Sequence, residues 1–240
     1  MIFVTGDTHA DIDIGKLNSS HFPDGRFLTK NDYVIITGDF GLIWDVNQST
    51  KRELYWLEWL SNKPWTTLFI DGNHENFDRI EKLNTKNMFG GTVGVVNDSI
   101  FHLKRGEIYD IEGIRFFAFG GAMSTDKEHR HIGISWWPQE IPSYTEMSYA
   151  IDNLTKFGNK VDVIITHTCP NRLIEPVIRA SNINRDSKYL SFRKDDPVSK
   201  FLDEIDKKVE FQKWFFGHFH CDVDIDDTYF CMYYNIDRLI

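Results

Sequence analysis

Five short apolar segments of this chain are each followed directly by a side chain that can bind a metal ion. The segments span residues 2–5, 33–37, 67–70, 161–166 and 213–216. They are rich in the β-branched and aromatic residues that favour strands. The polar groups that follow them, in chain order, are Asp7 with His9, Asp39, Asn73 with His74, His167, and His218 with His220. This repeated pairing of a strand with a polar exit constrains the fold more than any other feature of the sequence.

Helical patterns lie between these strands, at residues 50–60, 143–157 and 197–207. In the last of them Asp196 can cap the helix, and Pro197 suits its first turn. Strands that alternate with helices predict a layered α/β fold. In such folds the carboxyl ends of neighbouring strands open onto one crevice, so we expect the polar exits to converge.

The middle of the chain departs from this alternation. Residues 93–119 predict successive antiparallel strands, with tight turns at Lys104-Arg105-Gly106 and at Glu112-Gly113 and a further strand at 114–119. Residues 121–142 form a long segment without a clear period, and long loops inside a domain are often functional, so this segment is a candidate lid. Without a linker or an internal repeat, the sequence predicts a single domain over residues 1–240.

The spacing within the motifs supports a metal centre. Asp7 and His9 are separated by one residue, as are His218 and His220. In extended backbone this spacing puts both side chains on one face, so each pair can hold a single ion. Glycines 6, 38, 72 and 217 each precede a candidate ligand and permit a sharp exit from the strand.

The donor types narrow the choice of metal. Imidazoles, carboxylates and one amide without a thiolate suit Mn²⁺ first, with Fe or Zn as alternatives, rather than Ca²⁺. The candidate ligands are Asp7, His9, Asp39, Asn73, His167, His218 and His220. They exceed what one ion can use, so Asp39 is expected to bridge two ions. For Cys169 and Trp44 we favour ordinary packing.

The order of these motifs resembles the calcineurin-like metallophosphoesterases, whose signature is Asp-x-His, Gly-Asp, Gly-Asn-His-[Glu/Asp], His and Gly-His-x-His. The resemblance covers residues 1 to about 220. It implies an α/β/β/α sandwich of two mixed sheets flanked by helices, with both metals at one edge. It also implies that one metal is held by Asp7, His9, Asp39 and His220, and the other by Asp39, Asn73, His167 and His218.

The same resemblance implies a mechanism. His74 would stay free of metal and act on the leaving-group oxygen, and a metal-bridging hydroxide would be the nucleophile. One feature departs from the protein serine/threonine phosphatases of this family. Asp39 leads into Phe40-Gly-Leu-Ile-Trp44 and not into the motif that carries their orienting Asp and phosphate-binding Arg. Protein phosphatase activity is therefore disfavoured, and Asp45 and Glu75 are the remaining candidates to orient His74.

Composition restricts the partners. The formal net charge is −9, which disfavours bulk binding to nucleic acid or to anionic membranes. No apolar run approaches a membrane span. The three cysteines are odd in number and form no CxxC pair, which favours a reducing cytoplasm over secretion.

The sequence thus predicts a binuclear metal-dependent phosphoesterase that hydrolyses monoesters or diesters of a small nucleotide-like or sugar-phosphate substrate. Lys127 or Arg130 in the candidate lid is expected to contact a phosphate oxygen. One alternative is a nuclease, which would need a local basic face around Lys127, Arg130 and His131. Another is a metal-free binding scaffold, which the complete set of ligands argues against.

Overall fold

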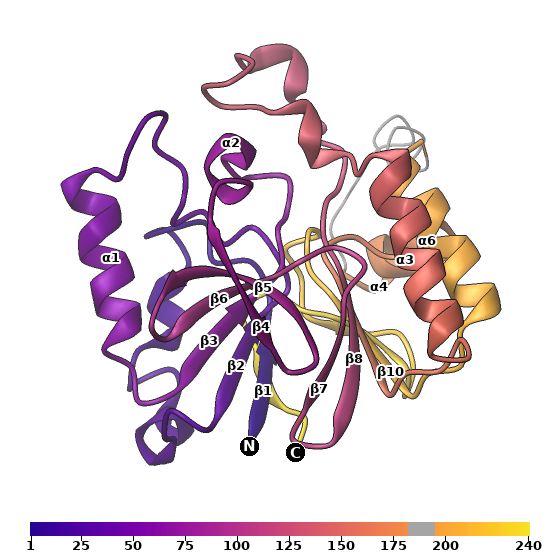
Figure 1. The fold of residues 1–240 in the computed structure, drawn as a ribbon, viewed down its shortest axis with the longest axis horizontal. Helices are drawn as coiled ribbons and strands as arrows, with labels where there is room; N and C mark the ends of the chain where they lie inside the picture. The colour runs from indigo at the N-terminus through magenta and orange to yellow at the C-terminus, as the bar shows by residue number, and fades with distance from the viewer. Residues whose placement is uncertain (182–194) are drawn as a thin grey trace.

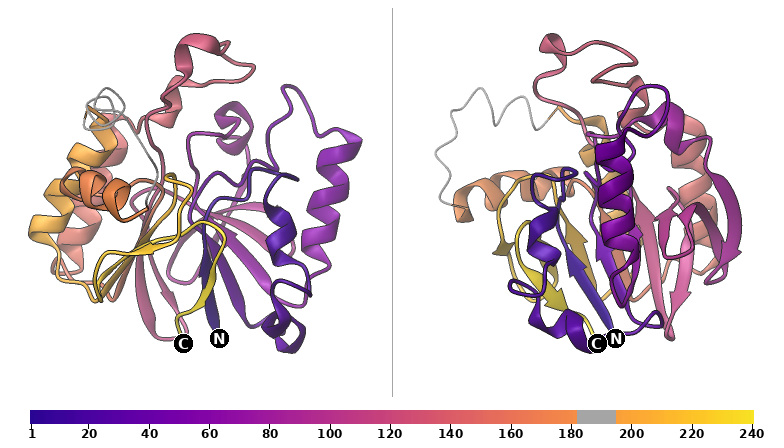
Figure 2. Two further views of the ribbon diagram at one scale, coloured as in Figure 1. Left: turned by 180° about the vertical axis from the view of Figure 1, so that it is seen from behind. Right: turned by 90° about the vertical axis from the view of Figure 1, so that its left-hand side faces the viewer.

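The computed structural model describes residues 1–181 and 195–240. In this part of the chain two mixed β-sheets pack face to face, and helices flank them on their outer sides (Figures 1 and 2). The predicted α/β/β/α sandwich is therefore confirmed. No helix in the described ranges is long and apolar enough to cross a membrane.

The first sheet has seven strands in the order β13-β1-β2-β3-β6-β5-β4. Its strands are β1 (Ile2–Thr5), β2 (Tyr33–Ile36), β3 (Thr66–Phe69), β4 (Asn84–Met88), β5 (Gly91–Asn97), β6 (Ile100–Leu103) and β13 (Ile236–Arg238). β1, β2, β3 and β6 run parallel, whereas β4, β5 and β13 pair antiparallel with their neighbours. The parallel strands bring three of the polar exits to the same edge.

The second sheet has six strands in the order β11-β12-β10-β9-β8-β7. Its strands are β7 (Ile108–Ile111), β8 (Ile114–Phe119), β9 (Val163–Thr166), β10 (Lys213–Phe216), β11 (Val223–Asp224) and β12 (Tyr229–Cys231). β8, β9, β10 and β12 are parallel, and β7 and β11 close the two edges in antiparallel pairing. This sheet supplies the other two polar exits, after β9 and β10.

Alternate residues of the strands fill the layers on either side. On β1, Ile2 and Val4 face the second sheet, while Phe3 packs outwards in the cluster that Leu60 of the first long helix joins. On β10, Phe215 faces the first sheet. Strands buried on both faces are mostly apolar along their length, and here the candidate ligands lie beyond their carboxyl ends.

The helices begin where the sequence places their caps. α1 (Lys51–Ser61), α3 (Tyr144–Lys156) and α6 (Pro197–Lys208) follow Thr50, Ser143 and Asp196, whose side chains accept from backbone N–H groups. The shorter helices are α2 (Phe77–Ile80), α4 (Ile174–Ala180) and the 3₁₀ turns Ile14–Leu17, Pro23–Phe27, Lys127–His129, Pro138–Glu140 and Asn171–Leu173. α1 covers the first sheet, and α3, α4 and α6 cover the second (Figure 1).

One topological prediction is confirmed only in part, because both strand pairs are antiparallel but they lie in different sheets. Residues 93–119 do not form a single antiparallel series, because β5 pairs with β6 in the first sheet and β7 pairs with β8 in the second. The turn at Lys104-Arg105-Gly106 therefore carries the chain from one sheet to the other, and only Glu112-Gly113 closes a hairpin. A turn rich in glycine and charge looks the same in sequence whether it joins paired strands or separate sheets.

Candidate metal centre

The polar exits of both sheets meet at one edge of the sandwich. Asp7 and His9 follow β1, Asp39 follows β2, and Asn73 follows β3. His167 follows β9, and His218 and His220 follow β10. The N-terminus of β1 lies at the opposite edge (Figure 1), so these loops open on the side from which residues 121–142 rise.

Four of the predicted ligands form a compact cluster. Asp7, His9, Asp39 and His220 each offer a donor atom, and these atoms all lie within 4.8 Å of one another. Nε2 of His9 is 3.2 Å from Oδ2 of Asp39, and Nε2 of His220 is 3.3 Å from Oδ2 of Asp7. Two donor atoms that each lie about 2.1 Å from one ion, with a ligand–metal–ligand angle of about 90°, are separated by roughly 3 Å. The cluster therefore fits a first-row divalent ion.

A second group of donors gathers on the other oxygen of Asp39. Nε2 of His167 lies 3.3 Å from Oδ1 of Asp39 and 3.1 Å from Oδ1 of Asn73. His218 lies beside this group, with its ring centroid 4.9 Å from that of His167. Its backbone N–H donates to the Asp7 carboxylate at 3.1 Å. Asp39 thus presents one oxygen to each group of donors, an arrangement in which a carboxylate can bridge two ions.

Hydrogen bonds outside the centre orient the imidazoles. Nδ1 of His167 donates to the carbonyl oxygen of Thr37 at 2.8 Å, which leaves Nε2 facing Asp39. Nδ1 of His9 contacts Oδ2 of Asp13 at 2.8 Å, and this contact turns Nε2 of His9 toward the carboxylate of Asp39. A carbonyl or carboxylate on the distal nitrogen is the usual partner of a metal-binding histidine.

The backbone at the strand exits is adapted to bring the ligands together. His9, Asp39, His218 and His220 all have positive φ, between 41° and 71°, a region that non-glycine residues seldom occupy. A Cβ on Gly72 would lie 2.0 Å from Oδ1 of Asp39. A Cβ on Gly38 would lie 2.2 Å from Nδ1 of His167, and a Cβ on Gly217 would lie 2.1 Å from Oδ1 of Asp7. These glycines thus make room for the ligands of neighbouring loops.

The electrostatics of the centre call for a cation. Burial opposes protonation of His9 and His167, but the charge of Asp39 and its hydrogen bonds to both rings outweigh burial and raise each pKa to about 9. Burial alone would raise the pKa of Asp39, yet His167, His74 and His9 hold that pKa well below its usual range. Two buried carboxylates thus attract protons to nearby imidazoles, and a divalent ion offers the same compensation.

His74 occupies a different position from the predicted ligands. Its backbone N–H donates to Oδ1 of Asp39 at 2.7 Å, while its ring faces Arg130, whose Nη1 is 3.0 Å from Nδ1. Burial lowers the pKa of His74; Asp39 opposes this and the charge of Arg130 adds to it. Neither carboxylate proposed to orient the ring contacts it there. Glu75 accepts from the backbone N–H groups of residues 40 and 41, and Asp45 accepts from the backbone N–H and the hydroxyl of Thr50.

The two basic residues of the candidate lid are separated by the structure. Arg130 is half-buried against His74 and is also paired with Asp126 at 2.7 Å. Lys127 is exposed on the 3₁₀ turn that it begins. Residues 121–142 rise over the carboxyl edge of the sheets (Figure 2), and Trp137 packs edge-on against Trp44 with centroids 5.5 Å apart. This segment therefore adjoins the centre, and whether it moves as a lid stays a prediction.

Three further residues, which were not evident from the sequence, support the centre. Nδ2 of Asn73 donates to Oγ of Ser124 at 3.1 Å, and Ser124 is bonded to the buried Glu140, which fixes the amide with its oxygen toward His167. Lys16 is fully buried and donates to the carbonyl oxygen of Asp7 at 2.8 Å. Burial lowers the pKa of Lys16 to about 8, although Asp7 and Asp13 oppose the shift. No local pattern distinguishes these residues from ordinary polar residues of a loop or turn.

Comparison with known proteins agrees with the fold and the motifs. The family model described as calcineurin-like phosphoesterase matches residues 1–222. A lariat debranching enzyme of Drosophila pseudoobscura pseudoobscura is 26% identical over 168 residues, and that of Drosophila melanogaster is 25% identical over 168 residues. The matches cover 66% of this chain and 29% of each relative, so the chain spans less than a third of those proteins. The family match covers more than half of the chain, and the chain therefore belongs to the calcineurin-like phosphoesterase family.

Proposed function

We propose that this chain is a binuclear metal-dependent phosphoesterase that hydrolyses monoesters or diesters of a small phosphorylated substrate. The observation that carries the proposal is that the two carboxylate oxygens of Asp39 face different groups of ligands. Oδ2 faces His9, and Oδ1 faces His167. One ion would be held by Asp7, His9, Asp39 and His220, and the other by Asp39, Asn73, His167 and His218. The donor set favours Mn²⁺, with Fe or Zn as alternatives.

Two divalent ions, when bound, would polarise the phosphate and lower the pKa of water at the centre. The side chains of this protein would do the rest. His74 is fixed by its backbone bond to Asp39 and presents an imidazole where a leaving-group oxygen would lie. Arg130 is beside it and could contact a phosphate oxygen through its guanidinium. The cysteine content supports the cytoplasm as the proposed location.

Metal analysis tests the bridging arrangement. We expect about two first-row ions per chain, about one after His9→Ala or His167→Ala, and fewer than one after Asp39→Ala, because only Asp39 belongs to both groups. Chelation should abolish hydrolysis, and Mn²⁺ should restore it better than Mg²⁺, since imidazole suits the softer ion. A single ion in the wild type, or an equal loss in all three variants, would refute the shared ligand.

A pair of chromogenic substrates tests the reaction class. Nitrophenyl phosphate reports monoesterase activity, and bis-nitrophenyl phosphate reports diesterase activity. The likeness to enzymes named for debranching lariats favours a second candidate, a nuclease acting on nucleic-acid esters. The net charge of −9 weighs against that candidate for bulk nucleic acid. Activity on neither chromogenic ester with both metals bound would reject the phosphoesterase proposal.

A further inference from the structure

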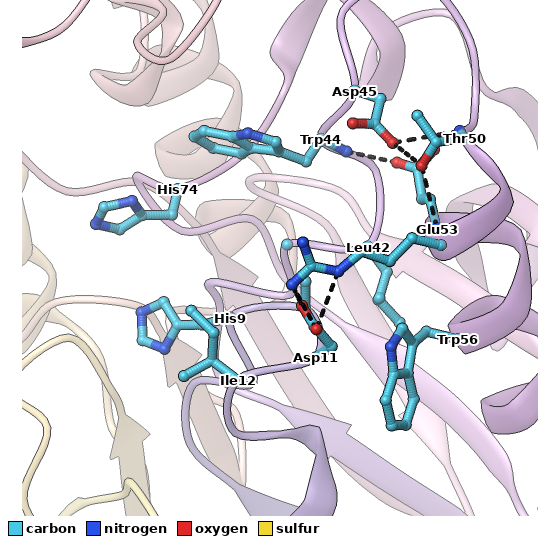
Figure 3. Close-up of a pocket in the computed structure, with 13 residues that line it drawn as sticks. His9, Asp11, Ile12, Leu42, Trp44, Asp45, Thr50, Glu53, Trp56 and His74 are labelled. Atoms are coloured by element: carbon cyan, nitrogen blue, oxygen red, sulfur yellow. Dashed lines mark hydrogen bonds and ion pairs between the residues drawn. The ribbon is translucent and has the colours of Figure 1, made fainter.

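A cavity of about 290 Å³ opens directly beside the candidate metal centre. His9 and His74 line it where it meets the centre (Figure 3). The rest of its lining comes from the loops after β1 and β2 and from the first turns of α1. Ligand pockets hold roughly 300–1,000 Å³, so this cavity is large enough for one ring system of a small ligand. A group placed in it would lie next to the reacting phosphate.

The walls of the cavity are aromatic and aliphatic. Trp44 and Trp56 line it and are both half-buried, and the exposed Ile12 and the buried Leu42 complete the apolar lining (Figure 3). We call this cavity the tryptophan pocket and define it by these four residues and the ion pair of Arg52 with Asp11. Broad indole faces bind flat rings by stacking, and such contacts tolerate any planar base. The lining therefore suits a planar ring better than a sugar or an aliphatic chain.

Hydrogen bonds hold the backbone of Trp44 in place. Its backbone N–H donates to Oε1 of Glu53 at 2.6 Å, and its carbonyl accepts from Nδ2 of Asn76 at 3.1 Å. Glu53 is itself buried and paired with Arg79 at 2.8 Å. Asn76 follows the Asn73-His74 motif by two residues, so one short segment supports both the metal loop and the tryptophan loop. A wall fixed in this way loses little entropy when a ligand binds.

The charges around the tryptophan pocket disfavour a second phosphate. Among the described residues at its lining, Arg52 is the one lysine or arginine, and its Nε donates to Oδ2 of Asp11 at 3.0 Å. Three carboxylates also line the pocket, those of Asp11, Asp45 and Glu53, and only the last of them is paired with a second arginine, Arg79. An anionic group would be repelled there, whereas the amino groups of a nucleobase could donate to a carboxylate oxygen. The pocket thus selects a neutral, nitrogen-bearing ring.

We propose that the tryptophan pocket binds the base of a nucleoside that forms the leaving group of the substrate. This inference rests on the proposed phosphoesterase function, because His74 is what directs the leaving oxygen toward the pocket. In the reaction water forms the new bond to phosphorus, the bond to the nucleoside oxygen breaks, and that oxygen takes a proton. A monoester then yields inorganic phosphate and a nucleoside, and a diester yields a phosphate monoester and a nucleoside.

Binding of adenosine tests the pocket without any hydrolysis. Adenosine should shift the indole N–H signals of Trp44 and Trp56 in NMR spectra of the full chain, and ribose at equal concentration should not. Trp56→Leu removes the flat ring and should weaken adenosine binding by about 5- to 100-fold, the usual value of one stacked base. Trp59→Leu is the matched control, since Trp59 lies on the same helix, is also half-buried and packs on the same core. Absent binding, or equal weakening in both variants, would overturn the proposal.

Hydrolysis of phosphate esters with and without a base provides a second test of the pocket. We expect kcat/KM for adenosine 5′-phosphate to exceed that for ribose 5-phosphate, because the two esters share a reacting group and differ at C1′, where one carries the base and the other a hydroxyl. For a diesterase, the methyl esters of the same phosphates make the same comparison. Trp56→Leu should reduce this ratio and Trp59→Leu should not. A ratio near one in the wild type would contradict the inference. Adenosine binding that depends on Trp56, with no ester hydrolysed, would reject the phosphoesterase proposal and support the pocket.

Discussion

His74 differs from the histidines around it in what its ring touches. Arg130 lies against the imidazole, and only the backbone of His74 reaches Asp39. His74→Asn should therefore keep both metals while lowering kcat by roughly 10²–10⁴-fold, the usual range for a lost proton donor. The defect should be smaller for a nitrophenolate leaving group, which needs little protonation. Metal analysis and kinetics on good and poor leaving groups measure both effects.

His218→Asn is the matched comparison for that variant. His218 packs against His167, so its loss should weaken the second metal site. Activity should then recover in part as Mn²⁺ is raised, whereas the His74 variant should not recover at any concentration. If the His74 variant loses metal, or is equally impaired on both leaving groups, the role assigned to its imidazole is wrong.

The two basic residues of segment 121–142 should behave differently on substitution. Arg130→Ala removes the guanidinium beside His74 and should raise KM markedly, with metal content unchanged. Lys127→Ala removes an exposed charge and should have little effect, although the sequence alone does not distinguish Lys127 from Arg130 as the phosphate contact. Steady-state kinetics on one phosphate ester separate the two. Equal effects in both variants would point to a general electrostatic contribution from this segment.

At the scale of elements, the sequence predicts most of what builds the centre. β1, β2, β3, β9 and β10 were all expected within about two residues of their observed bounds, because buried strands have an unbroken apolar pattern. The contacts between elements were not predictable. Ser124 reaches Asn73 across 51 residues, and Lys16 reaches Asp7 only because a 3₁₀ turn folds beneath the β1 exit. Such pairs depend on packing and leave no local signature.

The crossing between the two sheets depends on a buried ion pair. Arg105 donates to Asp71, which follows β3, with Nε 2.8 Å from Oδ2, and both side chains are buried. Arg105→Met should lower the free energy of unfolding by about 3–5 kcal/mol, because it leaves a buried carboxylate without its cation. Lys160→Met is the control, since its pair with Glu210 is exposed and should contribute less than about 1 kcal/mol. Urea denaturation measures both changes.

The same ion pair predicts how the stability of the protein changes at acidic pH. Burial favours the protonated form of Asp71, yet Arg105 and His102 hold its pKa at about 2. A folded-state pKa below the unfolded value contributes stability that is present above about pH 4 and is lost as pH falls through 2. The difference between wild type and Arg105→Met should therefore shrink over this interval. A difference that is constant down to pH 2 would show that packing of the arginine stem, and not its charge, stabilises the crossing.

At the scale of the whole molecule, folding and metal binding are coupled through the charge of the centre. In metal-free protein His9 and His167 take up protons with pKa values of about 9, because the charge of the neighbouring carboxylates outweighs burial. A raised folded-state pKa contributes stability that is fully present below the unfolded value of about 6.5 and is lost as pH rises through 9. Each imidazole contributes on the order of 3 kcal/mol at most.

Metal-free protein should therefore lose stability between about pH 6.5 and 9, while metal-loaded protein should lose much less. The reason is that divalent ions replace the protons on His9 and His167, so the affinity for metal rises as those protons become easier to displace. Urea denaturation at several pH values, with Mn²⁺ and with a chelator, measures the gap between the two forms. The gap should widen with pH in the wild type and widen less in His167→Asn, which lacks one of the two imidazoles. A gap that stays constant from pH 6.5 to 9 would show that protons and metal do not compete for these side chains.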